Sequence, residues 1–211
     1  MVAIHPRRDD AGRLVRIQRP SKPTPAAAWR DPCATVVVVP GGAVPRALHG
    51  VRMAPWRPTS AAGAWEALAA GITLTEPAFV APAGLEPAAG VVLVEPDGRI
   101  WLVQPSNAFG GVAHVVPKGR VDAGSTLAVT AMREAWEELG LLVQLTGHLV
   151  DVARSVTFTR YYLGRRVAGS VADMGAESQG AVLAPLARLP ALLNGPHDKV
   201  LVEVIVGRLA P

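Results

Sequence analysis

The sequence predicts an α/β fold in which a mixed sheet carries helices on both faces, preceded by an N-terminal extension. Two observations carry this prediction. Strand-like segments between residues 91 and 184 are interleaved with one central and one terminal helix, which is typical of a sheet covered on both faces. Half of the 211 residues are apolar, enough to fill a sizeable core.

The N-terminal region, residues 1–86, is predicted to be an arm followed by a small extension, and residues 87–211 to be the main domain. Residues 1–30 carry seven basic residues against two aspartates, a net charge of +5, so the rest of the chain sums to −1 against +4 in total. Prolines follow these charges, as in an arm or linker. A strand is expected at 34–39 and a helix at 61–70, with Trp65 and Leu68 on one face.

The main domain opens with strands at 91–95 and 99–104, joined by a turn at 96–98 in which Asp97-Gly98 supplies the positive φ that tight hairpins need. A strand is expected at 113–116 and a loop at 117–124. Ser125 or Thr126 then begins a helix that runs to about Leu139 and ends at Gly140. Strands at 142–153, 156–163 and 181–184, a short helix or turn at 186–194 and a final helix at 196–209, with Pro196 near its first turn, complete the domain.

Composition excludes several classes of protein. No apolar run approaches the roughly 20 residues of a membrane span, so no membrane partner is expected. The N-terminal residues show no secretory signal, and the single cysteine, Cys33, rules out a disulfide framework, so a cytoplasmic location is expected. No aromatic residue interleaves the N-terminal arginines, and nucleic acid is therefore not an expected partner.

The chemistry-bearing segment is the helix that ends in Arg133-Glu134-Ala135-Trp136-Glu137-Glu138-Leu139-Gly140. Glu134, Glu137 and Glu138 stand at positions i, i+3 and i+4, so their carboxylates share one helix face and repel one another. A hard divalent cation offsets such repulsion, because Mg²⁺ takes oxygen ligands and binds through carboxylates together with substrate phosphates. A solvated acidic face is the alternative interpretation of these three residues.

The segment from Gly119 to Leu141 resembles the Nudix box, G-x5-E-x7-R-E-U-x-E-E-x-G-U, where U is aliphatic. Six fixed positions match: Gly119, Arg133, Glu134, Glu137, Glu138 and Gly140. The first box glutamate is replaced by Ser125, which can cap the helix instead, and Asp122 is a candidate partner for Arg133. The resemblance covers about residues 88–207 and implies a Nudix-like α/β/α sandwich.

The resemblance also implies an activity and its residues. Members hydrolyse a pyrophosphate bond in a nucleoside diphosphate linked to another group, using Mg²⁺ or Mn²⁺. For this chain, the resemblance implies that the metal ligands are the carbonyl of Gly119 and the carboxylates of Glu134, Glu137 and Glu138. The base that activates water is either a box glutamate or Glu177 on a later loop. The expected partner is a small-molecule nucleoside diphosphate derivative.

Residues that flank the box are candidates for substrate binding. Lys118, Arg120, Arg154 and Arg160 are expected to bind phosphates, and Tyr161 stands where relatives place a base-stacking aromatic residue. Salt bridges are the alternative role for the cations, and a core position is the alternative for Tyr161, Tyr162 and Phe158. His114 has no second histidine at metal-ligand spacing and is not expected to be a ligand.

The substrate subclass is read from residues after the box. Members that act on ADP-ribose tend to carry a proline about fifteen residues beyond it, and no proline lies between Leu141 and Pro185. The Pro117-Lys118-Gly119 run and Tyr161, a couple of residues late, favour a dinucleoside polyphosphate. That type is ranked first, and ADP-ribose or a nucleotide sugar second.

Two other functions stay open. Ser125 raises the alternative of a catalytically weak or inactive Nudix-fold module that binds a nucleotide-like ligand for regulation. The basic arm raises the alternative of a protein that binds nucleic acid through residues 1–30, with an affinity that depends steeply on salt. Residues 1–86 either add strands near the substrate pocket or form a homodimer interface.

Overall fold

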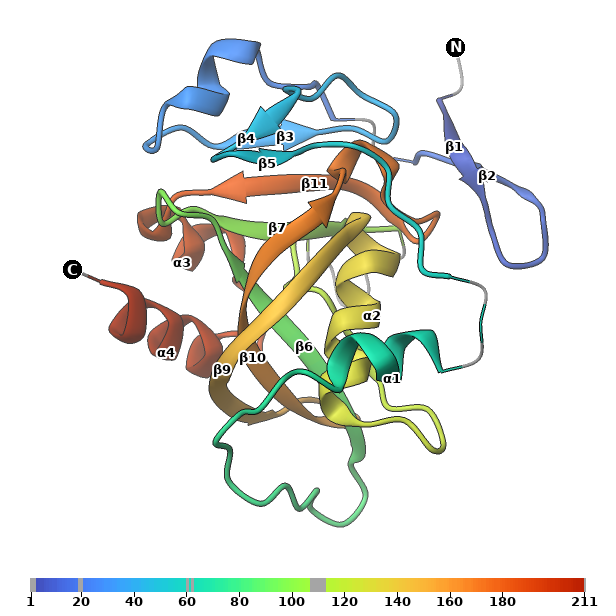
Figure 1. Cartoon of the computed structure of the whole chain (residues 1–211). Coiled ribbons are helices and arrows are strands. Elements are labelled where there is room, and N and C mark those ends of the chain that lie inside the picture. The colour runs from blue at the N-terminus through green and yellow to red at the C-terminus, as the bar shows by residue number, and fades with distance from the viewer. Residues whose placement is uncertain (1–2, 19–20, 60, 62, 107–112, 211) are drawn as a thin grey trace.

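The computed structural model describes residues 3–18, 21–59, 61, 63–106 and 113–210 (Figure 1). Its centre is a seven-stranded sheet in the order β3-β11-β7-β6-β10-β9, with β8 paired to β6. These strands are β3 (Val36–Val38), β6 (Glu86–Val94), β7 (Ile100–Pro105), β8 (Lys118–Arg120), β9 (Leu141–Ala153), β10 (Thr157–Gly169) and β11 (Ser178–Ala184). The sheet is mixed, because β6 and β10 run parallel and the other pairs are antiparallel.

Helices cover both faces of this sheet, as the sequence predicts. The helix α2 (Leu127–Leu139) lies against one face with the short α1 (Ala64–Ala69) beside it, while α3 (Leu189–Leu192) and α4 (Lys199–Leu209) lie on the other side (Figure 1). No helix among the described residues is both long and apolar enough to cross a membrane.

The strands serve two cores because successive side chains point to opposite faces of a sheet. Along β6, Val91 and Leu93 belong to the core under α2, whereas Val92 belongs to the core under α4. Along β7, Trp101 lies in the first core and Leu102 in the second. Apolar residues therefore follow one another without polar interruption, as in a sheet that is buried on both sides.

The N-terminal region is more ordered than an arm or linker. It contains a hairpin of β1 (Ile4–Arg8) and β2 (Leu14–Arg16), the 3-10 helix η1 (Ala26–Arg30) and a second hairpin of β4 (Ala47–Leu48) and β5 (Val51–Arg52). The expected strand at 34–39 is present as β3, which pairs with β11 and forms one edge of the main sheet. The division of the chain near residue 86 stays a prediction.

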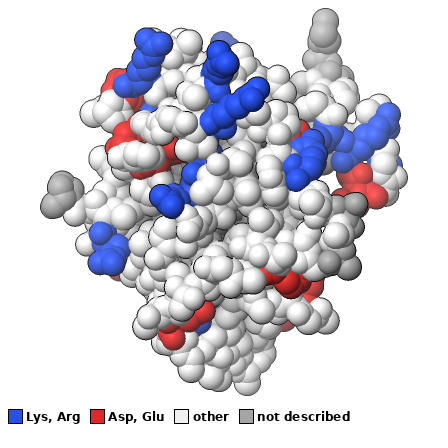
Figure 2. Space-filling model, in the orientation of Figure 1, with Lys and Arg blue, Asp and Glu red and all other residues white. Residues whose placement is uncertain are grey.

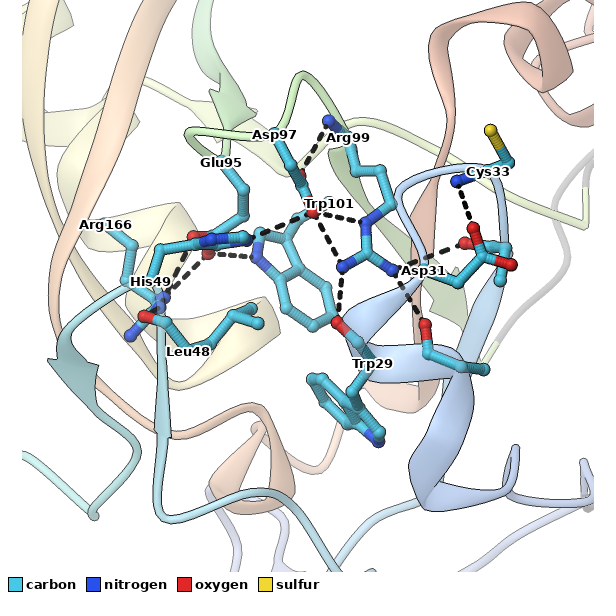
Figure 3. A network of polar contacts seen from close by, with 12 residues as sticks. Trp29, Asp31, Cys33, Leu48, His49, Glu95, Asp97, Arg99, Trp101 and Arg166 are labelled. Carbon is cyan, nitrogen blue, oxygen red and sulfur yellow. Dashed lines mark hydrogen bonds and ion pairs between the residues drawn. The ribbon is translucent and has the colours of Figure 1, made fainter.

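Buried ion pairs join this N-terminal region to the sheet (Figure 3). The Arg166 guanidinium, 1% exposed, donates to Glu95 Oε1 at 2.8 Å and to the carbonyl of Leu48 at 2.9 Å. Glu95 also accepts from Trp101 Nε1 at 2.8 Å. Because a buried charge is costly without partners, these bonds hold β4 in one place on the sheet.

A second arginine makes the corresponding connection to η1 (Figure 3). Arg99 pairs with Asp97 at 2.8 Å and donates to the carbonyl of Trp29 at 2.7 Å. The indole of Trp29 packs against that of Trp101, with ring centroids 6.1 Å apart. The segment before β3 is therefore fixed to the main sheet by both polar and aromatic contacts.

Several expected elements differ from the structure. Residues 113–116 make only an isolated bridge, Val103 with Val115, and the expected loop at 117–124 contains β8. The final helix begins at Lys199 rather than at 196, and a turn closed by the N–H of Asp198 on the carbonyl of Gly195, at 3.0 Å, precedes it. Leu68 on α1 is 38% exposed, whereas Trp65 packs against the core.

Candidate active site

The helix α2 is fixed at both ends by residues that the sequence marks. Thr126 rather than Ser125 is its N-cap, and the Thr126 hydroxyl accepts from the N–H of Val129 at 3.2 Å. Gly140 ends the helix with φ 70°. A Cβ there would lie 2.6 Å from the carbonyl oxygen of Ser170, so only glycine fits.

Gly119 on β8 lies directly against the glutamate face of α2. A Cβ built on Gly119 would stand 2.1 Å from Glu134 Oε1, far inside any real contact. The absence of a side chain therefore lets the backbone of β8 reach the Glu134 carboxylate. The sequence separates these two residues by fifteen positions, and the pairing of β8 with β6 brings them together.

Glu138 is held by the same strand. The backbone N–H of Lys118 donates to Glu138 Oε2 at 3.1 Å. Burial raises the pKa of Glu138 to about 8, and the Lys118 ammonium and N–H offset only part of that effect. This carboxyl therefore binds a proton readily when no cation is near it.

The pKa values of the other two glutamates on this face are also raised. Burial, reinforced by the charge of Glu137, raises the pKa of Glu134 to about 7, and burial also raises the pKa of Glu137. Arg133 lies 3.6 Å from both carboxylates and pairs more closely with Asp122, at 2.8 Å, which confirms that expected pair. The face thus carries more negative charge than its neighbours neutralise.

A cavity of about 600 Å³ opens beside this face. Its lining includes six residues expected at the site from sequence: Lys118, Gly119, Arg120, Glu138, Arg154 and Glu177. Glu134 and Glu137 are not among the lining residues. The Arg120 side chain pairs with Glu86 at 2.6 Å and is largely exposed. The size suits a ligand of nucleotide dimensions.

The segment that carries Glu177 is bonded to the C-terminal end of α2. The N–H of Gly175 donates to the carbonyl of Glu137 at 2.9 Å, and the hydroxyl of Ser178 donates to the carbonyl of Glu138 at 2.6 Å. The last carbonyls of a helix have no partner within it, so this segment supplies their hydrogen bonds. The charge of Glu177 contributes to the raised pKa of all three box glutamates.

Arg154 also lines the cavity, and two side chains hold its guanidinium. Its Nη2 pairs with the buried Asp198 at 2.8 Å, and its Nη1 donates to the Tyr161 hydroxyl at 3.1 Å. Tyr161 itself is 1% exposed and belongs to the core under α4. It does not line this cavity, so the expected base-stacking role of Tyr161 does not fit its position.

Arg160 lies away from the cavity, contrary to its expected role in phosphate binding. Its guanidinium is 2% exposed and pairs with Asp151 and Glu76, each at 2.7 Å. It also lies over the ring of Phe79, 5.0 Å from the centroid. Sequence could not reveal this, because Glu76 is 84 positions away.

Several lining residues had no sequence signal. They are Ser155, Val156, Thr157, Gly195, Pro196 and His197. They come from the turn between β9 and β10, the first residue of β10 and the turn before α4, and only the packing of α4 on the sheet places them together. His114 contacts Gln104 at 3.4 Å and does not line the cavity.

The donor set fits a hard divalent cation. Among the described residues, no three His, Cys, Asp or Glu side chains are already gathered closely enough to hold a metal ion. The carboxylates of Glu134 and Glu138 nevertheless meet β8 around Gly119, and all available donors are oxygen atoms, the type that Mg²⁺ and Mn²⁺ prefer. Burial, and after it the charges of neighbouring carboxylates, raises the pKa values of Glu134 and Glu138, and a bound cation would favour their ionised forms.

Comparisons with known proteins agree with this location. The model of the NUDIX domain family matches residues 84–203, more than half of the chain. An RNA pyrophosphohydrolase of Caulobacter vibrioides is 44% identical over 62 residues, which are 29% of this chain and 36% of the relative. The chain thus spans about a third of the length of the curated relatives it matches.

This chain is also similar to solved protein structures. An ADP-ribose pyrophosphatase from Streptococcus suis aligns with TM-score 0.49 and 18% identity, over 60% of this chain and 92% of the other. A C. elegans Ap4A hydrolase aligns with TM-score 0.47 and 20% identity, over 57% and 94%.

Proposed function

Because the chain belongs to the NUDIX domain family, we propose that it is a divalent-metal-dependent hydrolase that cleaves a pyrophosphate bond in a nucleoside diphosphate derivative. The observation that carries this proposal is the approach of Gly119 to Glu134 beside the cavity that Glu138 and Glu177 line. That arrangement places oxygen donors beside a ligand-sized space.

Each residue has a proposed role. The carbonyl of Gly119 and the carboxylates of Glu134, Glu137 and Glu138 would hold Mg²⁺ or Mn²⁺. When bound, such ions neutralise pyrophosphate charge and lower the pKa of the attacking water. Glu177 is the proposed base, since it lines the same cavity and its charge acts on all three glutamates. It would accept the proton of the attacking water.

The cavity also offers cations for phosphate groups. Lys118 lines it beside Glu138, and Arg154 lines it with its guanidinium already oriented by Asp198. An arginine fixed in advance loses little freedom when it binds an anion. Arg154 is therefore proposed to bind a phosphate of the substrate in this cavity.

For the substrate, a dinucleoside polyphosphate is proposed first and ADP-ribose or a nucleotide sugar second, on the residues after the box. A triphosphate 5′ end of RNA is a further candidate, because the RNA pyrophosphohydrolase of Caulobacter vibrioides is 44% identical over the matched residues. A weak or inactive binding module is the alternative that Ser125 raises. The cytoplasmic location and a homodimer through residues 1–86 stay predictions.

A substrate panel tests the proposal. The intact protein is incubated with dinucleoside polyphosphates, ADP-ribose, nucleotide sugars and 5′-triphosphate RNA, with Mg²⁺ or Mn²⁺ and again with EDTA. We expect metal-dependent phosphate release that Glu137→Gln abolishes and that Glu66→Gln, at an exposed position on α1, leaves unchanged. Ligand-induced thermal stabilisation without turnover of any substrate would establish the binding module instead.

A further inference from the structure

The segment that carries Glu177 is held from two sides. On one side it is bonded to the C-terminal end of α2 through Gly175 and Ser178. On the other side it meets the N-terminal region, where the N–H of Gly41 donates to the carbonyl of Ala172 at 2.7 Å. Residues far apart in sequence thus meet at one short stretch, 170–178.

The strongest contact on the N-terminal side is made by Asp173 and two arginines. Arg7 donates through Nη2 to Asp173 Oδ2 at 3.0 Å and through Nε to Oδ1 at 3.3 Å. Arg57 donates through Nη2 to Oδ1 at 3.0 Å and pairs through Nη1 with Oδ2. Both pairs are two-point contacts, which fix direction as well as distance. We call these three residues the arginine clamp.

The same N-terminal residues also contact α2. The guanidinium of Arg7 lies 5.5 Å from the ring centroid of Trp136, and Trp136 Nε1 donates to the carbonyl of Trp56 at 3.1 Å. Trp65 on α1 packs against Trp136 with centroids 5.9 Å apart. Trp136 is two positions from both Glu134 and Glu138 in sequence, so its side chain leaves α2 on the side opposite the glutamate face.

We propose that Arg7 and Arg57 are positioning residues that set Glu177 against the glutamates of α2. The N-terminal region contacts α2 at Trp136 and contacts the segment that carries Glu177 at Asp173. It thereby fixes the position of this segment relative to α2. This inference rests on the proposed function, in which Glu177 is the base. It gives residues 1–86 a role in the reaction without any contact to substrate.

The surroundings favour positioning over a purely structural contact. Arg57 is half-exposed, with 52% of its side chain accessible, and an exposed ion pair contributes little to stability. Asp173, in contrast, is 17% exposed and lies four residues before Glu177. A small shift of a base costs much more in rate than the same shift costs in folding free energy.

A double-mutant cycle tests the proposal on the full chain. Arg57→Gln, Glu177→Gln and the double variant are assayed with the best substrate of the panel. We expect Arg57→Gln to lower kcat about 10-fold with KM within about twofold, since the base is displaced and the substrate contacts remain. In the Glu177→Gln background the same change should lower kcat less than about twofold.

Matched variants separate position from charge. Arg57→Lys keeps the charge but loses the two-point geometry, so its kcat should fall between those of Arg57→Gln and the unaltered protein. Arg30→Gln, at an exposed arginine of η1, should leave kcat unchanged. Arg7→Gln should repeat the effect of Arg57→Gln. Unchanged kcat in both Arg57→Gln and Arg7→Gln would overturn the proposal, as would an equal loss with or without Glu177.

Hydrogen exchange provides a readout that needs no activity. Peptides that span 170–178 should exchange about 10-fold faster in Arg57→Gln than in Arg30→Gln, because the clamp no longer holds the segment. Unchanged exchange there would overturn the proposal.

If the unaltered protein hydrolyses nothing, the proposed function fails and the base role of Glu177 fails with it. If it does hydrolyse substrate but Glu177→Gln keeps full kcat, only the Glu177 assignment and this inference fall.

Discussion

The backbone N–H of Gly175 donates a hydrogen bond of 2.9 Å to the carbonyl oxygen of Glu137. One residue lies in the segment of the candidate base, and the other is a proposed metal ligand. The hydrogen bond therefore joins the segment to the end of the helix, and it satisfies a carbonyl that α2 itself leaves open.

Substitution of Gly175 should damage this junction. A Cβ at Gly175 would lie 2.0 Å from the carbonyl oxygen of Glu137, so Gly175→Ala must displace the segment. We expect a loss of about 1–3 kcal/mol in the free energy of unfolding from overpacking, measured by urea denaturation. Gly207→Ala is the control, because nothing lies within 4 Å of its Cβ position. Equal stability of the two variants would contradict the close approach.

Substitution of Gly119 should affect metal binding more than folding. A Cβ there pushes against Glu134 Oε1, at the end of a side chain that can turn away. We expect Gly119→Ala to weaken Mg²⁺ or Mn²⁺ binding by at least about 10-fold in calorimetric titration. Gly147→Ala, with open space around its Cβ position, should bind metal normally. Unchanged affinity in Gly119→Ala would remove Glu134 from the proposed ligand set.

Glu177 should matter for rate and not for substrate affinity. If it is the base, Glu177→Gln lowers kcat by about 10²-fold or more and leaves KM and metal affinity nearly unchanged. Steady-state kinetics and metal titration of the same preparation measure both effects. A raised KM with normal kcat would instead make Glu177 a binding residue.

Arg160 should be structural. Its loss leaves the carboxylates of Asp151 and Glu76 without their cation, so Arg160→Gln should lower the free energy of unfolding by about 3 kcal/mol. Urea denaturation measures this, and KM should not change in the variant that remains folded. Arg165→Gln, on the same strand and exposed, serves as the control. A raised KM with normal stability would restore Arg160 to the substrate site.

The pH dependence of stability should report the Asp173 contact. Burial acts to raise the pKa of Asp173, but hydrogen bonds from Arg57 and Arg7 outweigh it and hold that pKa below its usual 3.8. The folded state then binds this proton more weakly than the unfolded state. Its stabilisation is full above about pH 4 and is lost as the pH falls through the folded-state pKa.

Because Arg57 is half-exposed, Arg57→Gln should cost no more than about 1 kcal/mol at about pH 7. This small difference from the unaltered protein should shrink toward about pH 3. Thermal unfolding at a series of pH values measures the gap. A gap that is constant over this range would mean that the loss does not come from the ionised Asp173 carboxylate.

The sequence by itself determined the parts that depend on short spacing. The placement of Glu134, Glu137 and Glu138 on one helix face, the stop at Gly140 and the hairpin turn at Asp97-Gly98 follow from local periodicity and backbone preference. The box pattern that identified the family also lies within one continuous stretch, from Gly119 to Leu141.

The tertiary structure alone decided which distant residues meet. Arg160 and Tyr161 carry the residue types of a binding site, yet strand register buries both, while Arg154 reaches the cavity wall. The pairing of Arg7 and Arg57 with Asp173 spans 166 and 116 positions. No local pattern encodes such contacts, because they form only when the strands pair and bring together segments that are far apart in the sequence.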